Sequence, residues 1–385
     1  MLRGLAIVIQ GAVLAASLVP SVVWAQDLPK GRIIDDLKCQ ADATQSYALY
    51  LPSNYTPDKK WSVLMAFDAR ARGRTPVERY QAAAEKFGYI VAGSNNSKNG
   101  PARVSMMAAK AMEADLEARF SIDPKRMYAA GQSGGARFAI DLVGSSKGQF
   151  AGVIASSAGF PPSMGTELEL PYVVFGTAGT EDFNYLELRR MERSVKTAHR
   201  VKVFVGEHTW LPSELAVEAL EWLELQAMRT GTRAKDDAMI DRMFAARKAE
   251  LAAMKDLGEI YYANRDMATD FKGLRDVEAF AKQADEMTNR KDVVEAVRKI
   301  IVGDMDESRV DAEILNYSDQ LENDAERVEM MEKLTTMLRK LGADAHMAED
   351  TQERRKARRI LHGVLADNAS RKDAEYKKLL DEVKP

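Results

Sequence analysis

The chain has 385 residues, of which 46% are apolar, and its 55 Lys and Arg residues nearly balance 58 Asp and Glu residues, for a net charge of -3. This balance excludes the strongly basic surface that favours nucleic acid or an anionic membrane as a partner. The length fits one α/β domain and a smaller second unit, and the proline and glycine content does not indicate disorder.

The first 25 residues are expected to form a cleaved export signal, separate from the fold. Arg3 precedes an apolar run over residues 5–19, Pro20 interrupts that run, and the small residues Val23 and Ala25 follow at the positions that a signal peptidase reads. The run is short for a membrane span, so an uncleaved anchor is the less favoured alternative. We expect a mature chain that starts near Gln26 and is secreted or periplasmic, without a later membrane span.

Cys39 is the only cysteine. An exported protein with one cysteine cannot form an internal disulfide, so its stability must come from its core. We expect the Cys39 thiol to be buried or unreactive.

Strand and helix patterns alternate between residues 46 and 228. Apolar runs typical of strands lie at 46–51, 61–67, 89–93, 127–130, 150–155, 171–175 and 201–205, and helical patterns lie at 76–87, 103–120, 133–143, 186–198 and 213–228. The run at 61–67 is almost continuously apolar, as in a strand buried on both faces. The alternation predicts a mostly parallel sheet with helices on both faces.

The segment Gly131-Gln132-Ser133-Gly134-Gly135 lies between an apolar strand and an alanine-rich helix start. In that context, Gly-x-Ser-x-Gly forms a sharp turn that lifts the serine hydroxyl above the sheet. Small residues at 131 and 135 let the two backbones approach each other. Serine is a weak nucleophile until a base takes its proton, so the motif predicts a histidine and a carboxylate elsewhere.

Two residues in the right positions follow later strands. Asp182 lies in the loop after 171–175, and His208 follows 201–205. Reactive groups in such sheets lie beyond the carboxyl ends of strands, and the chain order Ser, Asp, His is the order of an α/β-hydrolase triad. Glu181 is the alternative acid. His199, His346 and His362 are less suitable bases, because His199 precedes its strand and the other two lie in a charged helical region.

These motifs resemble the α/β-hydrolase superfamily, and within it secreted esterases of the polyhydroxybutyrate depolymerase and feruloyl esterase group. The residues that carry the resemblance are 50–55, 131–135 and 206–212, and it covers about residues 42–228. The resemblance implies an α/β-hydrolase fold in which Ser133 is the nucleophile, Asp182 the acid and His208 the general base.

The expected activity is therefore serine hydrolysis of a small-molecule or polymeric carboxylic ester through an acyl-enzyme. The oxyanion needs two backbone N–H donors, one expected at Gly134 and the other at Ala69 or Arg70 after the 61–67 strand. No metal-ligand cluster or phosphate-binding loop is evident, so neither a metal nor another cofactor is expected. A serine peptidase of the prolyl oligopeptidase type and a non-catalytic hydrolase-fold binding protein are the alternatives.

Three arginines alternate at Arg70, Arg72 and Arg74, in the loop beside the expected site. Arginine presents a planar fork that fits carboxylates, so a clamp for a substrate carboxylate is one interpretation. A solvated loop with salt bridges is the more common outcome for such charges. Trp210, two residues after His208, is interpreted either as a pocket wall or as a core aromatic.

Residues 231–385 are expected to form an all-α region, separate from the catalytic domain at 26–230. Apolar residues recur at helical spacing, and stops expected near Gly258, Gly273, Gly303 and Gly342 divide the region into several helices. A packed helical bundle is favoured, with a degenerate tetratricopeptide-like platform as the alternative. Either arrangement leaves room for a protein partner or self-association.

Overall fold

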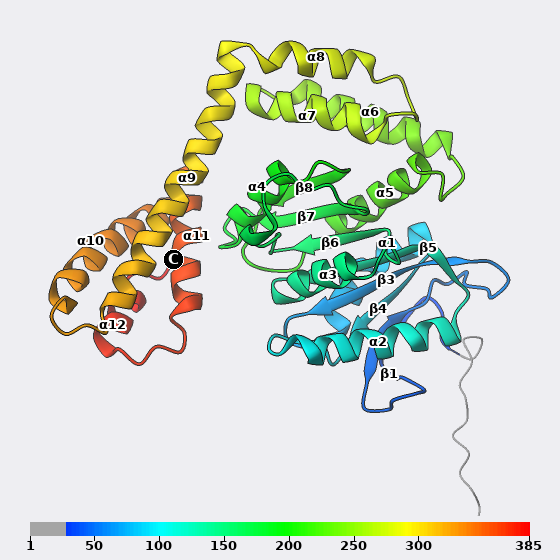
Figure 1. Cartoon of the computed structure of the whole chain (residues 1–385), viewed down its shortest axis with the longest axis horizontal. Helices are drawn as coiled ribbons and strands as arrows, with labels where there is room; N and C mark the ends of the chain where they lie inside the picture. Colours follow the sequence, from blue (N-terminus) through cyan, green and yellow to red (C-terminus); the bar gives the residue numbers. More distant parts are fainter. Residues whose placement is uncertain (1–27) are drawn as a thin grey trace, which may run out of the picture.

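The computed structural model describes residues 28–385, so the expected export signal lies outside the described residues. An eight-stranded sheet with the order β1-β2-β4-β3-β5-β6-β7-β8 lies at its centre (Figure 1). β2 is antiparallel to β1 and β4, and the other neighbouring strands are parallel. The strands are β1 (Ile33–Lys38), β2 (Ser46–Tyr50), β3 (Trp61–Asp68), β4 (Tyr89–Ser94), β5 (Ile122–Gln132), β6 (Gly152–Ser156), β7 (Val173–Gly179) and β8 (His199–Phe204).

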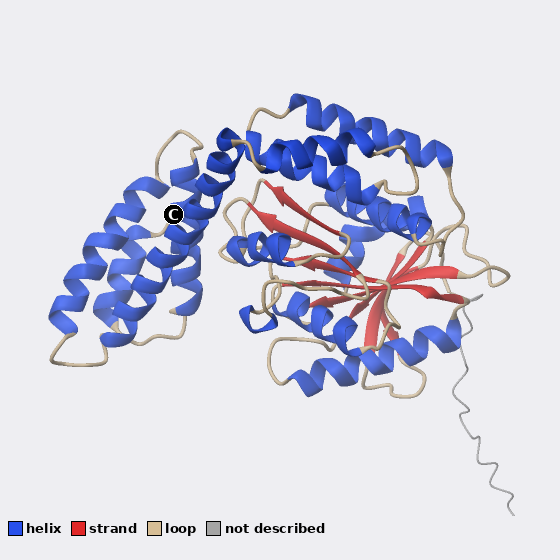
Figure 2. Cartoon of the chain, turned by 45° about the horizontal axis from the view of Figure 1, so that its top comes forward, coloured by secondary structure: helices blue, strands red, loops and turns tan. Residues whose placement is uncertain are grey.

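Helices cover both faces of the sheet, as predicted (Figure 2). One apolar cluster joins the sheet to α2 (Ala102–Arg119), α3 (Gly134–Ser145) and α4 (Tyr185–Ser194), and a second joins it to α1 (Arg74–Phe87) and α5 (Ser213–Arg229). Along β3, Val63 and Met65 belong to the first cluster, whereas Leu64 and Ala66 belong to the second. This alternation shows that the mostly parallel sheet is buried on both faces, as predicted.

Two local features show what the sequence pattern captures and what it misses. The first helix ends at Phe87 as predicted, because Gly88 adopts φ +73° and caps it in a left-handed conformation. β1 was not predicted, since its sequence Ile-Ile-Asp-Asp-Leu-Lys is half polar and it pairs only with β2 at the sheet edge.

Cys39 is buried, and burial raises the pKa of its thiol to about 11, with a further contribution from the Asp115 carboxylate.

After α5 the described chain is helical. The helices are α6 (Asp237–Ala253), α7 (Leu257–Asp270), α8 (Glu278–Thr288), α9 (Lys291–Gln320), α10 (Arg327–Ala345), α11 (Gln352–Asp367) and α12 (Ala374–Val383). α6 and α7 share an apolar cluster with α5, whereas α10, α11 and α12 share another with the second half of α9. The long α9 connects the two groups, so the all-α region is two packed groups on a common helix (Figure 1).

Helix boundaries lie near three of the four glycines, but the stop expected near Gly303 is wrong, because α9 continues through it. Gly258 lies in the first turn of α7, Gly303 lies within α9 and Gly342 lies within α10, while Gly273 does separate α7 from α8. A Cβ at Gly342 would lie 3.1 Å from Val383 Cβ, and one at Gly258 would lie 2.9 Å from Ile300 Cδ1. These two glycines therefore allow close helix packing, which offsets their poor helix propensity.

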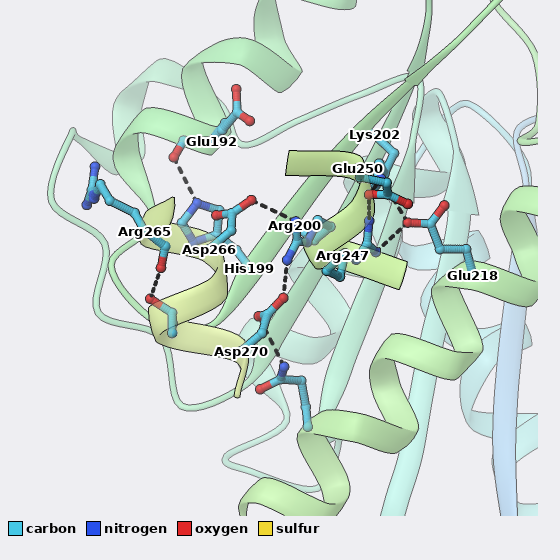
Figure 3. A network of polar contacts seen from close by, with 12 residues as sticks. Glu192, His199, Arg200, Lys202, Glu218, Arg247, Glu250, Arg265, Asp266 and Asp270 are labelled. Atoms are coloured by element: carbon cyan, nitrogen blue, oxygen red, sulfur yellow. Dashed lines mark hydrogen bonds and ion pairs between the residues drawn. The ribbon is translucent and has the colours of Figure 1, made fainter. Parts of the chain in front are cut away.

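A buried charge network attaches α7 to the sheet edge (Figure 3). Arg200 of β8 donates to Asp266 at 2.7 Å and also pairs with Asp270, and the side chains of Arg200 and Asp270 are 8% and 2% exposed. Burial opposes the charge of Arg200, but the two carboxylates outweigh it and raise the pKa of the guanidinium. The arginine is therefore the cation that pairs with the buried Asp270 side chain inside the interface.

Replacing Arg200 with alanine is expected to destabilise the protein by about 3–5 kcal/mol, because it leaves the Asp270 carboxylate buried without its cation. Urea unfolding at neutral pH measures this loss. Arg242→Ala is the matched control, since Arg242 makes an exposed pair with Glu221 and should change stability by about 0.5 kcal/mol or less. Equal, small losses in both variants would contradict the expected role of Arg200.

Candidate active site

Ser133 occupies a strained turn between β5 and α3. Its φ of +57° and ψ of -125° are uncommon for a residue with a side chain. A Cβ at Gly131 would lie 2.1 Å from the carbonyl oxygen of Gly135, and a Cβ at Gly135 would lie 2.0 Å from that of Phe67. Both glycines are thus required for the close approach of strand and helix, and the turn holds Ser133 beyond the carboxyl end of β5.

The loops after β7 and β8 bring Asp182 and His208 together. His208 Nδ1 lies 2.8 Å from Asp182 Oδ1, with the Asp182 side chain fully buried and the His208 side chain 19% exposed. The Phe183 ring stacks on the imidazole at a centroid distance of 4.0 Å and an interplanar angle of 21°. Because a carboxylate accepts the Nδ1 proton, Nε2 of the neutral ring remains an acceptor.

Backbone and side-chain hydrogen bonds tie the Ser133 turn to these loops. The Ser133 N–H donates to the Ser156 carbonyl at 2.9 Å, and the neighbouring Ser157 hydroxyl donates to the Thr209 carbonyl at 2.9 Å. The Asn184 amide donates to the Ser157 carbonyl at 2.7 Å. Within residues 28–385, the Ser133 hydroxyl makes no hydrogen bond to His208. Such catalytic contacts commonly tighten only when substrate binds.

Glu181, the alternative acid, points elsewhere. The Arg358 guanidinium of α11 donates to both of its carboxylate oxygens, at 3.2 and 3.1 Å. Asp182, in contrast, accepts from His208 and from the backbone N–H of Asn184 through Oδ1. Between the two neighbouring acids, the geometry pairs Asp182 with the histidine.

The other three histidines contact backbone carbonyl groups. His199 starts β8, and its Nδ1 and Nε2 lie 2.8 and 2.9 Å from the carbonyl oxygens of Thr197 and Glu192. Nδ1 of His346 lies 2.7 Å from the Gly342 carbonyl oxygen, and Nδ1 of His362 lies 3.1 Å from the Glu181 carbonyl oxygen. None of the three is hydrogen-bonded to Asp182 in the part of the chain that the structure describes.

A buried carboxylate at the end of β3 organises the loop that was expected to carry the second oxyanion donor. Asp68 is fully buried, and it accepts two hydrogen bonds from Arg72, both at 2.9 Å, and one from the Trp210 indole at 2.8 Å. It also accepts the backbone N–H of Arg70 at 2.8 Å. The backbone nitrogen of Ala69 lies beside the Ser133 turn, 3.4 Å from the position that a Cβ on Gly135 would occupy.

These contacts argue against the substrate clamp suggested by the alternating arginines. Arg72 is bound to Asp68, and Arg74 pairs with Glu78 at 2.6 Å and with Asp35. Trp210 is 2% exposed and packs edge-on against Tyr80, so it is a core aromatic. Arg72, Arg74 and Trp210 are thus engaged with other protein groups instead of being free to contact a substrate. The Arg70 N–H already has an acceptor, which leaves Ala69 as the better placed of the two candidate donors.

Asp68 should make the stability of this loop dependent on pH. Burial alone would raise its pKa, but the hydrogen bonds from Arg72, Trp210 and the Arg70 N–H outweigh burial and hold the pKa below its ordinary value. A lowered folded-state pKa gives stability that is complete above the unfolded pKa of about 3.9 and is lost as the pH falls through the folded value.

Asp68→Asn is accordingly expected to cost about 1–3 kcal/mol at pH 7, because it leaves buried donors poorly satisfied. The difference from the wild type should shrink below about pH 4, where the Asp68 carboxylate of the unfolded wild type begins to take up a proton, and shrink further as the pH falls through the lower folded-state pKa. Urea unfolding of both proteins at pH 7 and at pH 3 measures the two differences. A deficit that is the same at both pH values would show that the charge of Asp68 is unimportant.

Two residues near the candidate site were missed by the sequence analysis. Phe183 was passed over although it directly follows Asp182, because a lone aromatic in a loop has no distinctive pattern. Asn99 lies against the Ser133 turn, because a Cβ at Gly134 would be 1.8 Å from Asn99 Oδ1. Asn99 is held there by its N–H, which donates to the Ala69 carbonyl at 2.9 Å. A side chain at position 134 would therefore displace the Asn99 amide.

Within residues 28–385, no group of three or more His, Cys, Asp or Glu side chains is arranged to hold a metal ion. The helices of that range also include none that is both long and apolar enough to cross a membrane.

No protein-family model matches the chain, and neither does any curated protein. Solved structures that it resembles include FphF, a fluorophosphonate-binding serine hydrolase of Staphylococcus aureus, at 16% identity and a TM-score of 0.39 over 51% of this chain and 99% of that one. A ferulic acid esterase matches at 16% identity and a TM-score of 0.39 over 49% of this chain and 96% of the other. Est1E of Butyrivibrio proteoclasticus matches at 13% identity and a TM-score of 0.40 over 51% and 100%.

Proposed function

We propose that this chain is a serine hydrolase that cleaves a carboxylic ester through an acyl-enzyme on Ser133. The proposal rests mainly on one observation. The hydrogen-bonded Asp182–His208 pair and the strained Gly-x-Ser-x-Gly turn all follow the carboxyl ends of parallel strands, on the same side of the sheet. An exposed serine alone is unreactive, whereas a serine beside a histidine of fixed tautomer has a base for its proton.

The chemistry follows from these positions. His208 Nε2 takes the Ser133 proton as the oxygen attacks the acyl carbon, and the Asp182 carboxylate stabilises the imidazolium that forms. The imidazolium then returns the proton to the departing alcohol, which leaves an ester between the acyl group and Ser133. Water, deprotonated by His208, attacks this ester and releases the acid and the free serine.

The negative oxygen of the tetrahedral intermediates needs donors that are already in place. The N–H groups at the start of α3 have no acceptor within the helix, and Gly134 is the first of them. We assign Gly134 and Ala69 as the two donors, since the Arg70 N–H is bound to Asp68. The positive end of α3 adds to the stabilisation of an anion at this point.

Hydrolysis of nitrophenyl esters, compared with that of matched nitroanilide amides and peptides, tests the proposal and its nearest alternative. We expect turnover of esters by the wild type, with amides cleaved far more slowly. Faster cleavage of peptide amides would favour a peptidase of the prolyl oligopeptidase type. Absence of turnover with every ester and amide would leave a hydrolase-fold binding protein acting through its helices.

The export signal expected at residues 1–25 remains a proposal, and with it a secreted or periplasmic location. It rests on the apolar run and on the small residues Val23 and Ala25 at the expected cleavage positions. An extracellular or periplasmic enzyme of this kind would meet small or polymeric esters outside the cytoplasm.

A further inference from the structure

Helix α11 of the C-terminal region contacts the loop that carries Asp182. Arg358 binds both oxygens of the Glu181 carboxylate, and Arg359 donates to the Thr180 carbonyl at 2.8 Å. His362 donates from Nδ1 to the Glu181 carbonyl at 3.1 Å. Three side chains from successive turns of one helix thus hold the two residues that directly precede Asp182.

The contact continues past Asp182. A Cβ at Gly363 would lie 3.4 Å from Phe183 Cβ, so the helix backbone packs closely beside the residue whose ring stacks on His208. In Figure 1, α11 lies beside the sheet edge where β7 ends. Helix α11 therefore contacts the residues before and after Asp182, although about 180 positions separate the two segments in the sequence.

The arginines that make this contact are themselves fixed. Arg359 forms a bidentate pair with Glu307 of α9 at 2.7 and 2.6 Å, and both side chains are less than 10% exposed. Its guanidinium also lies 4.4 Å from the centroid of the Tyr185 ring at the start of α4. A buried bidentate pair restricts the arginine to one geometry, so α11 is a rigid support for the loop.

Backbone hydrogen bonds also hold this loop, among them Glu181 N–H to the Gly206 carbonyl at 2.9 Å and Asp182 N–H to the Gly179 carbonyl at 3.2 Å, but few side-chain contacts orient the Asp182 carboxylate itself. Asp182 Oδ1 accepts the two hydrogen bonds from His208 and Asn184, whereas the buried Oδ2 has no hydrogen-bond partner among the described residues. The orientation of this carboxylate consequently depends on where the loop backbone is held. A displacement of about 1 Å in a catalytic group can lower a rate by about 100-fold.

We propose that α11 is a positioning element for the Asp182–His208 pair, with Arg358, Arg359 and His362 as positioning residues. The inference rests on the proposed function, in which that pair activates Ser133. The all-α region then has a direct role in the reaction, because it holds residues 180–183, the loop that carries Asp182. Separation of α11 from the loop, by a partner or by mutation, would lower turnover without touching the substrate.

Arg358→Ala tests this role by removing the cation from Glu181. We expect kcat for a nitrophenyl ester to fall by about 10- to 100-fold with little change in KM, since the loop shifts but the substrate contacts remain. Arg358→Lys should recover part of the loss. Arg339→Ala is the control, because Arg339 makes an exposed pair with Glu382 within the same helical region and should leave kcat unchanged.

Glu181→Gln provides a second route if Arg358→Ala folds poorly, since it weakens the same pair from the loop side. The double variant should lose no more activity than the worse single variant, as expected for two partners in one contact. Additive losses, or equal losses in Arg339→Ala, would overturn the inference. So would unchanged kcat in both Arg358→Ala and Glu181→Gln.

A spectroscopic measurement separates failure of this inference from failure of the proposed function. Proton NMR of the wild type should show a strongly deshielded His208 Nδ1–H, identified by its absence in His208→Gln. In Arg358→Ala this resonance should weaken or move, and in Arg339→Ala it should stay. That result would support α11 as a positioning element even if no ester were hydrolysed. An unchanged resonance in Arg358→Ala would contradict it even in an active esterase.

Discussion

Ser133→Ala is expected to lower kcat for ester hydrolysis by up to about 10⁶-fold, the scale seen when the nucleophile of a serine hydrolase is removed. The alanine variant retains the glycines at 131 and 135 that shape the turn, so its structure should be preserved. The loss should therefore appear in kcat with little effect on stability. The measurement is steady-state kinetics with a nitrophenyl ester, accompanied by thermal unfolding of both proteins.

The matched control for this change is Ser157→Ala. Ser157 lies in the next loop and also has a positive φ, but its hydroxyl donates to the Thr209 carbonyl and is therefore engaged in structure. We expect Ser157→Ala to reduce activity far less than Ser133→Ala. Comparable losses from the two substitutions would indicate that the hydroxyl of Ser133 is not the nucleophile.

Asp182→Asn is expected to lower kcat by about 10⁴-fold, because an amide at this position favours the wrong tautomer of His208. The carboxylate accepts the Nδ1 proton at 2.8 Å, whereas an asparagine can turn its NH₂ toward the ring and force the proton onto Nε2. With its proton on Nε2, the histidine cannot take one from Ser133. The loss should persist across the pH range in which the wild type is active.

Glu181→Gln is the informative comparison, since the two acids are neighbours in the chain. Its carboxylate binds Arg358, so its neutralisation should disturb only the support of the loop, with a loss of no more than about 100-fold. If Glu181→Gln were the more damaging substitution, Glu181 would replace Asp182 as the acid. Steady-state kinetics of the two variants with one ester distinguishes these cases.

The sheet was predictable because its strands carry local signals. Strands buried on both faces require nearly continuous apolar residues, as in β3. The Ser133 turn requires glycine at 131 and 135, because a side chain there would clash with the backbone. β1 lacks such a signal, because an edge strand tolerates the polar residues that it contains.

The sequence alone left two interpretations of the arginines at 70, 72 and 74. Arg72 pairs with Asp68 and Arg74 with Glu78, each four positions away, and Arg74 also pairs with Asp35, 39 positions away, so salt bridges occupy both arginines. The packing of Gly342 against Val383 is a tertiary contact, which a single sequence does not show.

The contact between α11 and residues 180–183, the loop that carries Asp182, is likewise a tertiary contact. Arg358 and Glu181 are separated by 177 positions, and the arginine-rich sequence around 354–359 has the pattern of a solvated helix face. Only the packing of α9 against α4 and α11 brings that face to the sheet edge. A single sequence carries no local signal for such a contact.

Labelling with a fluorophosphonate probe, followed by peptide mapping, tests the central claim most directly, because the probe forms a stable bond only with an activated serine. We expect one adduct per chain, on the peptide that contains Ser133, with none in Ser133→Ala and strongly slowed labelling in His208→Gln. A wild-type protein that remains unlabelled, or an adduct on another serine that persists in Ser133→Ala, would contradict it.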